Sequence, residues 1–265
     1  MSAAHTACGT DDSLMAGGRC KLYAMNVAIF GGTFDPIHRG HIAVARAAAE
    51  AYDLGRIYFV PADIPPHKQR RAITPFFHRY AMVALATQSE RNFFPSLLEA
   101  PGEEALRAPS YSIETVRRFR SLLPRSDKVY FLIGIDAFMD VGKWYQAEAL
   151  LREVEFIVAS RPGFSLADVA QALPEAMRPP DQVADAFKKR AAKGKMAVGG
   201  AVIHLLPRLN EAASATEIRK AAQSGRSLAR WLPEAVVEYV KKMHLYEENA
   251  AHRRDSRLRA RGLRL

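Results

Sequence analysis

The chain has 265 residues, which is enough for one large domain or two small ones with a sizeable hydrophobic core. Its two cysteines, Cys8 and Cys20, lie near the N-terminus, so the rest of the chain has no thiol for a disulfide, a zinc site or a nucleophile. No apolar run approaches the roughly 18 residues of a membrane span, and the N-terminus lacks the features of a signal peptide. These observations exclude a membrane protein and a secreted disulfide scaffold and predict a cytoplasmic protein.

The formal net charge of +10 is unevenly distributed. Residues 250–265 contain six arginines and one acidic residue, so this tail carries half of the excess. The remaining surplus suits a substrate with several phosphates as well as it suits a nucleic acid. Because both ends lack apolar periodicity, we expect a disordered extension at 1–24, a single domain at 25–246 and a disordered basic tail at 247–265.

Within the domain, apolar runs of strand length alternate with segments of helical periodicity. The runs predict strands at 27–30, 57–60, 129–133, 156–159 and 202–206. The periodic segments predict helices at 42–52, 79–87, 112–122, 147–154 and 217–223, followed by a short C-terminal helix at 233–243. The polar, basic stretch 179–195 interrupts the alternation as a surface excursion. This order predicts an α/β, Rossmann-like fold: a parallel sheet with helices on both faces and a short C-terminal helical segment.

The segment between the first strand and the first helix, which we call the first signature, reads Gly31-Gly32-Thr33-Phe34-Asp35-Pro36-Ile37-His38-Arg39-Gly40-His41. It lies at the carboxyl edge of the sheet, where open α/β folds bind ligands. Its glycines allow a ligand to approach the backbone, and the helix start offers unpaired N–H groups to phosphate. Because His38 and His41 are three residues apart, we expect both imidazoles to face the same anion and to donate to it during transfer.

Two other interpretations of the histidine pair compete with phosphate binding. Two histidines three residues apart are compatible with a zinc site, but no neighbouring Cys or His completes a ligand set. A purely structural pair leaves the glycines and the strand-to-helix junction unexplained.

A second signature, Ser214-Ala215-Thr216-Glu217-Ile218-Arg219, stands at the predicted start of the helix that follows the last strand. Ser214 or Thr216 can cap that helix. Arg219 lies one turn further, either as a surface residue or as a group that holds a polyphosphate through two parallel hydrogen bonds.

These segments resemble the signatures of the HxGH nucleotidyltransferase superfamily, GGTFDPxHxGH for the first and SSTxIR for the second. Within the superfamily the chain most resembles the bacterial nicotinate-nucleotide adenylyltransferases, over about residues 25–246. Supporting matches are Pro65-Pro66-His67-Lys68, Pro109-Ser110-Tyr111-Ser112-Ile113-Glu114-Thr115, Gly134-Ile135-Asp136 followed by Trp144, and Asn210-Glu211. Ala215 departs from the second serine of SSTxIR, and Ser112 stands where these enzymes usually have threonine.

The resemblance implies an enzyme of NAD biosynthesis that joins the AMP moiety of ATP to nicotinate mononucleotide and releases pyrophosphate. It implies catalytic roles for His38, His41 and Arg219. It implies ATP and phosphate binding by Gly31, Gly32, Thr33, Phe34, Gly40, Lys68, Gly134, Asp136, Ser214 and Thr216. It implies nicotinate-nucleotide binding by Ser112, Trp144 and Tyr145, with the tryptophan stacked on the nicotinate ring. Mg²⁺ is expected on the ATP phosphates, without a cage of protein ligands.

Related activities are open alternatives. Within the superfamily, the alternatives are an enzyme with nicotinamide mononucleotide or phosphopantetheine as acceptor, or one with a cytidylyl nucleotide as donor. The Pro-Pro-His-Lys and Pro-Ser-Tyr-Ser segments favour the nicotinate enzyme. An RNA-binding protein on the same fold is an alternative from another class, with the basic tail as its footprint. Such a protein has no need of two phosphate signatures, so we expect no nucleic-acid partner. The oligomeric state does not follow from the sequence.

Overall fold

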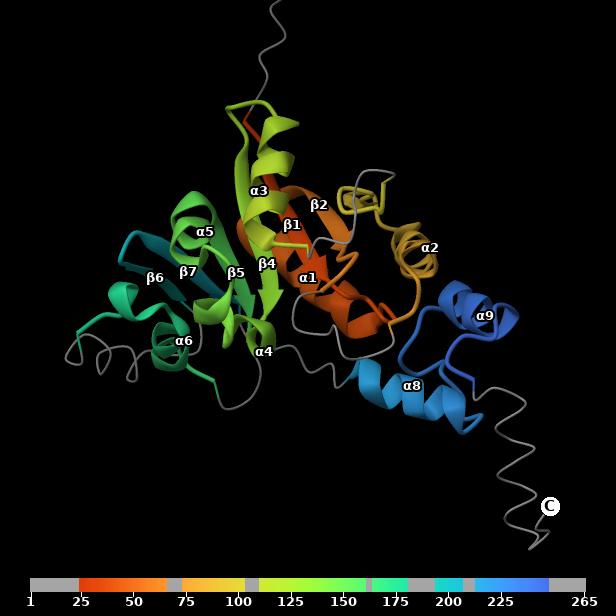
Figure 1. The fold of residues 1–265 in the computed structure, drawn as a ribbon. Coiled ribbons are helices and arrows are strands. Elements are labelled where there is room, and N and C mark those ends of the chain that lie inside the picture. Colours follow the sequence, from red (N-terminus) through yellow and green to blue (C-terminus); the bar gives the residue numbers. More distant parts are fainter. Residues whose placement is uncertain are drawn as a thin grey trace, which may run out of the picture.

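The computed structural model describes residues 24–65, 73–102, 110–160, 164–180, 194–206 and 213–247. Seven strands in these parts form one sheet in the order β3-β2-β1-β4-β5-β7-β6 (Figure 1). The strands are β1 (Asn26–Gly32), β2 (Leu54–Pro61), β3 (Phe93–Pro95), β4 (Lys128–Gly134), β5 (Glu155–Ala159), β6 (Gly194–Val198) and β7 (Ala201–Leu206). Every neighbouring pair is parallel except β6 and β7, which are antiparallel.

The strand order places a topological switch point between β1 and β4. From β1 the chain continues outward through β2 and β3, and it then returns to β4 and builds the other half of the sheet. β1 and β4 pair from Asn26↔Lys128 to Phe30↔Leu132. Because the chain leaves the carboxyl ends of these two strands in opposite directions, a crevice suited to ligands forms there.

Helices cover both faces of the sheet, as predicted. They are α1 (Arg39–Tyr52), α2 (Phe76–Thr87), α3 (Ser112–Ser121), α4 (Ile135–Phe138), α5 (Ala147–Glu153), α6 (Leu166–Ala172), α8 (Ala215–Gln223) and α9 (Glu234–Lys242), with short 3₁₀ turns η2 (Val141–Lys143) and η3 (Glu175–Met177). Strand side chains alternate between two cores: Val27 and Ile29 pack with α3, α5 and α6, whereas Ala28 and Phe30 pack with α1, α2, α8 and α9.

Four helices and strands were not predicted from the sequence, namely β3, α4, α6 and β6, and neither were the short turns η2 and η3. β6 makes the sheet mainly parallel rather than wholly parallel, and it begins inside the stretch 179–195 that was read as a surface excursion. Of that stretch, residues 181–193 lie outside the described residues, as do residues 1–23 of the predicted extension at 1–24 and residues 248–265 of the predicted tail at 247–265. No helix in the described parts of the chain is long and apolar enough to cross a membrane.

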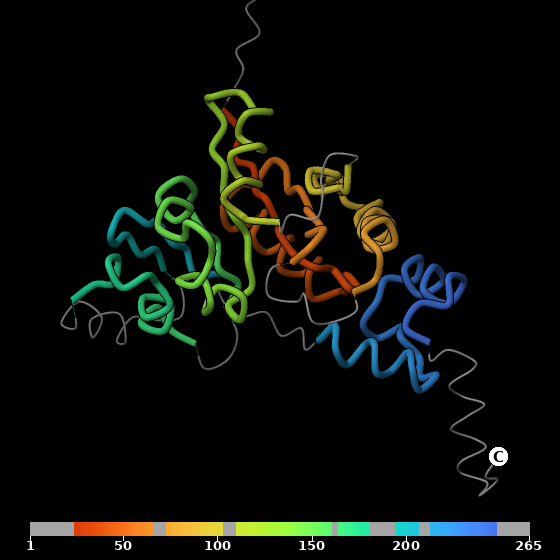
Figure 2. The backbone as a smooth tube through the Cα atoms, viewed as in Figure 1, coloured from red at the N-terminus to blue at the C-terminus, as the bar shows by residue number. Residues whose placement is uncertain are grey.

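The C-terminal helices return to the face that carries α1 and α2. Figure 2 shows the blue C-terminal segment beside the orange segment that contains α2. A hydrogen bond of 2.9 Å between Nδ1 of His78 on α2 and the hydroxyl of Tyr239 on α9 joins the two helices. The end of the described chain is thereby brought close to the carboxyl edge of the sheet.

Candidate active site

The first signature leaves β1 at the switch point and leads into α1. A Cβ on Gly32 would come within 2.9 Å of the Phe34 ring, so this glycine is required for the loop to pack. Phe34 has a positive φ of 49°, and its buried ring contacts Phe30 and Phe59. The side chain of Phe34 therefore belongs to the core, which leaves its backbone for the predicted contact with phosphate.

The two histidines of the first signature lie face to face at the start of α1. Their ring centroids are 3.7 Å apart with an interplanar angle of 26°. The backbone N–H of His38 donates to Nδ1 of His41 over 3.2 Å. A ring nitrogen that accepts a hydrogen bond cannot carry the proton, so neutral His41 carries its proton on Nε2. In this tautomer the far side of the ring is a donor, which is the role that a phosphate oxygen requires.

Arg219 connects the second signature to the first. It lies on α8, and its Nη1 donates to the main-chain oxygen of Asp35 while its Nη2 donates to the Thr216 hydroxyl over 3.1 Å. Of the two predicted caps of α8, Ser214 or Thr216, the N-cap position is occupied by Ser214, although its side chain makes no capping hydrogen bond. The two signatures, far apart in sequence, therefore meet at one edge of the sheet.

A pocket of about 620 Å³ opens between the carboxyl ends of β1 and β4. The three residues predicted to bind the nicotinate nucleotide, Ser112, Trp144 and Tyr145, all line it. Trp144 is half-buried and packs edge-on against Phe131, with ring centroids 6.4 Å apart. The pocket also contacts the beginning of the first signature, at Gly31, Gly32 and Thr33.

Other predicted site residues lie outside this pocket. Gly134 ends β4, and Asp136 lies in the first turn of α4; both are exposed at the same edge of the sheet. Gly40 is buried in the first turn of α1, where a Cβ would come within 3.1 Å of the His38 ring. Lys68 is outside the described residues, so its contact with phosphate stays a prediction.

Arg79 is a buried arginine to which the sequence analysis gave no role. It is 1% exposed, and its guanidinium donates to three main-chain oxygens: to Thr74 over 2.7 Å, to Thr33 over 2.8 Å and to Asp63 over 3.2 Å. Burial lowers the pKa of Arg79, although the nearby carboxylates of Asp35 and Asp63 act to raise it. The arginine thus fixes the first signature, the loop after β2 and the segment before α2 relative to one another.

Glu99 is a further pocket residue that the sequence analysis missed. It is half-buried, and it accepts a hydrogen bond of 2.5 Å from the Thr115 hydroxyl on α3. Burial raises the pKa of the Glu99 carboxyl above its usual value. No sequence pattern marked this residue, because it lies in an irregular segment between β3 and α3.

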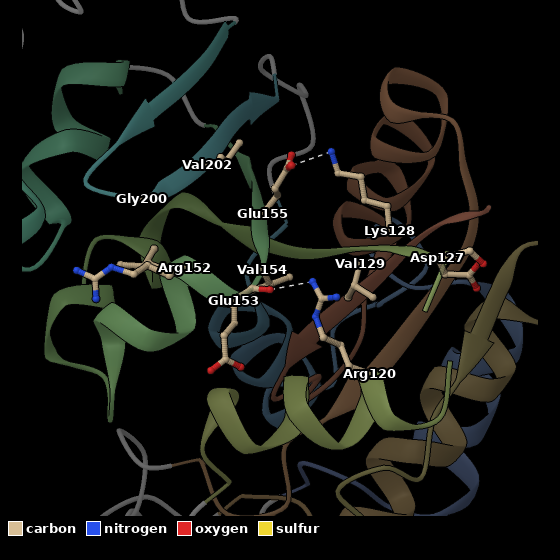
Figure 3. Close-up of a pocket in the computed structure, with 12 residues that line it drawn as sticks. Arg120, Asp127, Lys128, Val129, Arg152, Glu153, Val154, Glu155, Gly200 and Val202 are labelled. Carbon is tan, nitrogen blue, oxygen red and sulfur yellow. Dashed lines mark hydrogen bonds and ion pairs between the residues drawn. The ribbon is translucent and has the colours of Figure 1, made fainter. Parts of the chain in front are cut away.

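A second cavity, of about 400 Å³, lies at the opposite, amino edge of the sheet (Figure 3). Two of its charged side chains, Lys128 and Glu155, pair over 2.7 Å, and the same carboxylate contacts His204, which lies outside the lining, over 2.7 Å. Arg120 donates to the main-chain oxygen of Glu153 over 2.8 Å. None of the predicted site residues lines this cavity. The candidate site is therefore at the carboxyl edge.

Comparisons with known proteins identify the family to which the chain belongs. The family model described as cytidylyltransferase-like matches residues 29–221, which include both signatures. A probable nicotinate-nucleotide adenylyltransferase from Geobacter sulfurreducens is 36% identical over 224 residues, covering 84% of this chain and 98% of that protein. Another from Thermoanaerobacter sp. is 32% identical over 225 residues, covering 85% and 96%. The chain belongs to the nicotinate-nucleotide adenylyltransferase family.

Solved structures share the fold of this family member. A Plasmodium falciparum nicotinic acid mononucleotide adenylyltransferase complexed with NaAD has a TM-score of 0.60, and the match covers 85% of this chain and 98% of that one. The two sequences are 20% identical, so the likeness concerns the fold. It confirms the predicted Rossmann-like architecture.

Proposed function

We propose that the protein joins the AMP moiety of ATP to nicotinate mononucleotide, giving nicotinate adenine dinucleotide and pyrophosphate in NAD biosynthesis. An oxygen of the acceptor's 5′-phosphate forms a bond to the α-phosphorus of ATP, and the bond from that phosphorus to the oxygen bridging to the β-phosphate breaks. One observation carries the proposal: the paired histidines and Arg219 lie at the same switch point as an aromatic-lined pocket. A dinucleotide-forming enzyme needs both, one for the triphosphate and one for the ring.

The attacking oxygen is already ionised, so no strong general base is required. Catalysis then consists of positioning the reactants and neutralising charge, as in phosphoryl transfer generally. We assign His38 and His41 to the triphosphate and the transferring phosphorus, because His41 presents Nε2–H as a fixed donor. We assign Arg219, with the hydroxyls of Ser214 and Thr216, to the β- and γ-phosphates.

The remaining assignments follow the placement of the loops. Backbone groups of the first signature, including those of Gly31, Gly32, Thr33, Phe34 and Gly40, are assigned to phosphate. Asp136, exposed just after β4, is assigned to a ribose hydroxyl of ATP, beside the backbone of Gly134, and Lys68 to phosphate. These roles are supported by position at one sheet edge, and each can be tested by substitution.

Mg²⁺ is the cation expected to act with ATP. Among the described residues no three His, Cys, Asp or Glu side chains gather as a metal site. We propose that the cation is held mainly by phosphate oxygens and water, which is how Mg²⁺ usually binds with nucleotides. Such a cation neutralises phosphate charge when bound, while the histidines and Arg219 supply the protein's share.

The pocket is expected to prefer the acid to the amide. If Trp144 stacks on the ring, the carboxylate of nicotinate falls near the backbone N–H groups of Ser112 and Tyr145, which are fixed donors. A carboxylate accepts from both, whereas an amide turns its NH₂ toward one of them and leaves it unpaired. Each mismatch costs about 1 to 3 kcal/mol, so one or two of them give roughly ten- to ten-thousandfold discrimination.

The test is pyrophosphate release from ATP with nicotinate mononucleotide, nicotinamide mononucleotide or phosphopantetheine, and from CTP with each of them. We expect kcat/KM for the acid to exceed that for the amide by at least about a hundredfold. Equal turnover of acid and amide would contradict the assignment of the pocket but would still support the adenylyltransferase activity. Turnover of phosphopantetheine alone, or of CTP in place of ATP, would overturn the proposal.

A further inference from the structure

Asp35 is the point at which four segments of the chain meet. It is 7% exposed and belongs to the first signature. Its main-chain oxygen accepts from Arg219. Its carboxylate accepts from the backbone N–H of Thr74 over 3.4 Å and from the hydroxyl of Tyr246 over 2.7 Å. A buried carboxylate needs such donors, because leaving one oxygen without a partner is costly.

Tyr246 reaches this aspartate through an unusual backbone path. After α9 ends, His244 and Tyr246 have positive φ values of 51° and 66°, which non-glycine residues rarely adopt. This path turns the chain back toward the sheet, where the Tyr246 ring packs against the core that contains Met82. A conformation of this kind persists only where surrounding contacts determine it, and it is common at functional sites.

The hydrogen bond from the Tyr246 hydroxyl to the Asp35 carboxylate is shorter than the one from the backbone N–H of Thr74. Burial and the adjacent Asp35 charge raise the pKa of Tyr246, so the hydroxyl keeps its proton and remains a donor. The guanidinium groups of Arg79 and Arg219 lie close enough to interact with this pair electrostatically. Tyr246 is thus part of a buried polar network beneath the first signature, in which the loss of one partner affects the others.

We propose that Tyr246 is a positioning residue for adenylyl transfer: its hydroxyl fixes Asp35, and through Asp35 it holds Arg219 and the first signature in the geometry that binds the triphosphate. The inference rests on the proposed function, because it assigns the triphosphate to those groups. Neither Tyr246 nor Asp35 lines the acceptor pocket around Trp144; the pocket meets the network only at its margin, through Thr33, whose main-chain oxygen accepts from Arg79. The proposal therefore predicts that loss of the Tyr246 hydroxyl weakens the binding of ATP and leaves the binding of the acceptor unchanged.

The test compares Tyr246→Phe with a matched control, Tyr239→Phe, in the full chain. Tyr239 is also a tyrosine of the C-terminal segment whose hydroxyl has a partner at 2.9 Å, but that partner is His78 on α2. Each variant loses one hydroxyl and keeps its ring. A hydrogen bond to a charged group changes an equilibrium constant by about tenfold or more. We expect Tyr246→Phe to raise the KM for ATP by about tenfold and to lower kcat, with the KM for the acceptor unchanged, and Tyr239→Phe to change neither KM.

The contrast between the KM for ATP and the KM for the acceptor distinguishes a positioning role of Tyr246 from a role in stability alone. A variant that only unfolds more easily shows a lower apparent kcat and a lower thermal midpoint, with both KM values unchanged; that result for Tyr246→Phe would overturn the proposal. An equal rise of the ATP KM in Tyr239→Phe would also overturn it, because the effect would then belong to α9 as a whole.

Failure of the proposed function gives a different result. If the wild-type protein does not turn over ATP with any of the candidate acceptors, binding of a non-hydrolysable ATP analogue is measured by calorimetry for the wild type and both variants. Weaker binding by Tyr246→Phe alone would support the role of Tyr246 at a nucleotide site even then. Equal affinities for all three proteins would overturn it.

Discussion

At the scale of single residues, His41 is held on several sides. The rings of Phe30 and Phe34 pack edge-on against its imidazole, with centroids at 5.9 and 5.1 Å, and His38 stacks on its face. A donor fixed in this way needs no reorganisation when charge develops on the transferring phosphate. We therefore predict that His41→Ala lowers kcat by roughly two to three orders of magnitude without unfolding the protein.

Steady-state kinetics and circular dichroism check this prediction, with His78→Ala as a control histidine outside the signatures. Metal analysis addresses the alternative interpretation of the pair. Stoichiometric zinc in the purified wild-type protein, lost in His41→Ala together with activity, would show that the histidine is a metal ligand rather than a phosphate donor.

The residues that the sequence analysis identified are those with local signals. The histidine pair, the glycines and Ser112 stand in short segments whose spacing places them at strand ends or helix starts, and the structure has them there. Arg79 and Tyr246 carried no such signal. The contact of Tyr246 with Asp35 joins residues 211 positions apart, and it depends on how α9 packs, which no local pattern encodes.

At the scale of elements, one carboxylate links three strands at the amino edge of the sheet. Glu155 on β5 contacts Lys128 on β4 (Figure 3), and it also contacts His204 on β7. Partial burial acts to raise the pKa of Glu155, but hydrogen bonds from Lys128 and His204 and the electrostatic attraction to these two groups outweigh it, so its pKa lies below the usual value. A lowered pKa means that the charged form stabilises the folded state.

This stabilisation has a defined pH range. It is complete above the pKa of an unfolded glutamate, about 4.3, and is lost as the pH falls through the lower pKa of the folded state. We predict that Glu155→Gln lowers the free energy of unfolding at pH 7 by about 1 kcal/mol or less, because solvent screens a carboxylate that is still partly exposed. The difference from the wild type should shrink as the pH falls below 4.3.

Urea denaturation at a series of pH values measures this effect. Glu148→Gln is the matched control, because Glu148 pairs with Arg152 over 3.1 Å on an exposed helix surface, where such a pair contributes about 0.5 kcal/mol or less. A difference between Glu155→Gln and the wild type that is constant from pH 7 to pH 3 would contradict the assignment of the stabilisation to the Glu155 charge.

The elements found from the sequence are those with long apolar runs or clear helical periodicity. β3 has only three residues and ends in proline, too short for a periodic signal. β6 did have a local signal: Gly199 and Gly200, with φ values of 57° and 85°, form the two-residue turn to β7, and Gly-Gly between two strand-like runs indicates a hairpin. The polar stretch 179–195 hides this signal, because β6 begins inside it.

At the scale of the whole molecule, the site depends on both halves of the chain. The first signature and the pocket around the β1–β4 switch point come from residues before 150, whereas Arg219 and Tyr246 come from the last part of the described chain. The connection between them is the packing of α8 and α9 against the face that carries α1 and α2. The C-terminal helices therefore serve the site as well as the core.

This arrangement defines where the chain can be shortened. The predicted domain, 25–246, ends at the residue that contacts Asp35, and all the residues that we assign to the site lie within it. We predict that deletion of residues 1–24 and 250–265 leaves activity within a few-fold of the full chain. A chain that ends at Leu245 lacks the Tyr246 hydroxyl and should lose about tenfold or more in kcat/KM for ATP, because a hydrogen bond to a buried charge is lost. Pyrophosphate release and thermal unfolding of the two truncated proteins check this prediction, and similar activity of both would show that the chain beyond Leu245 makes no contribution to the site.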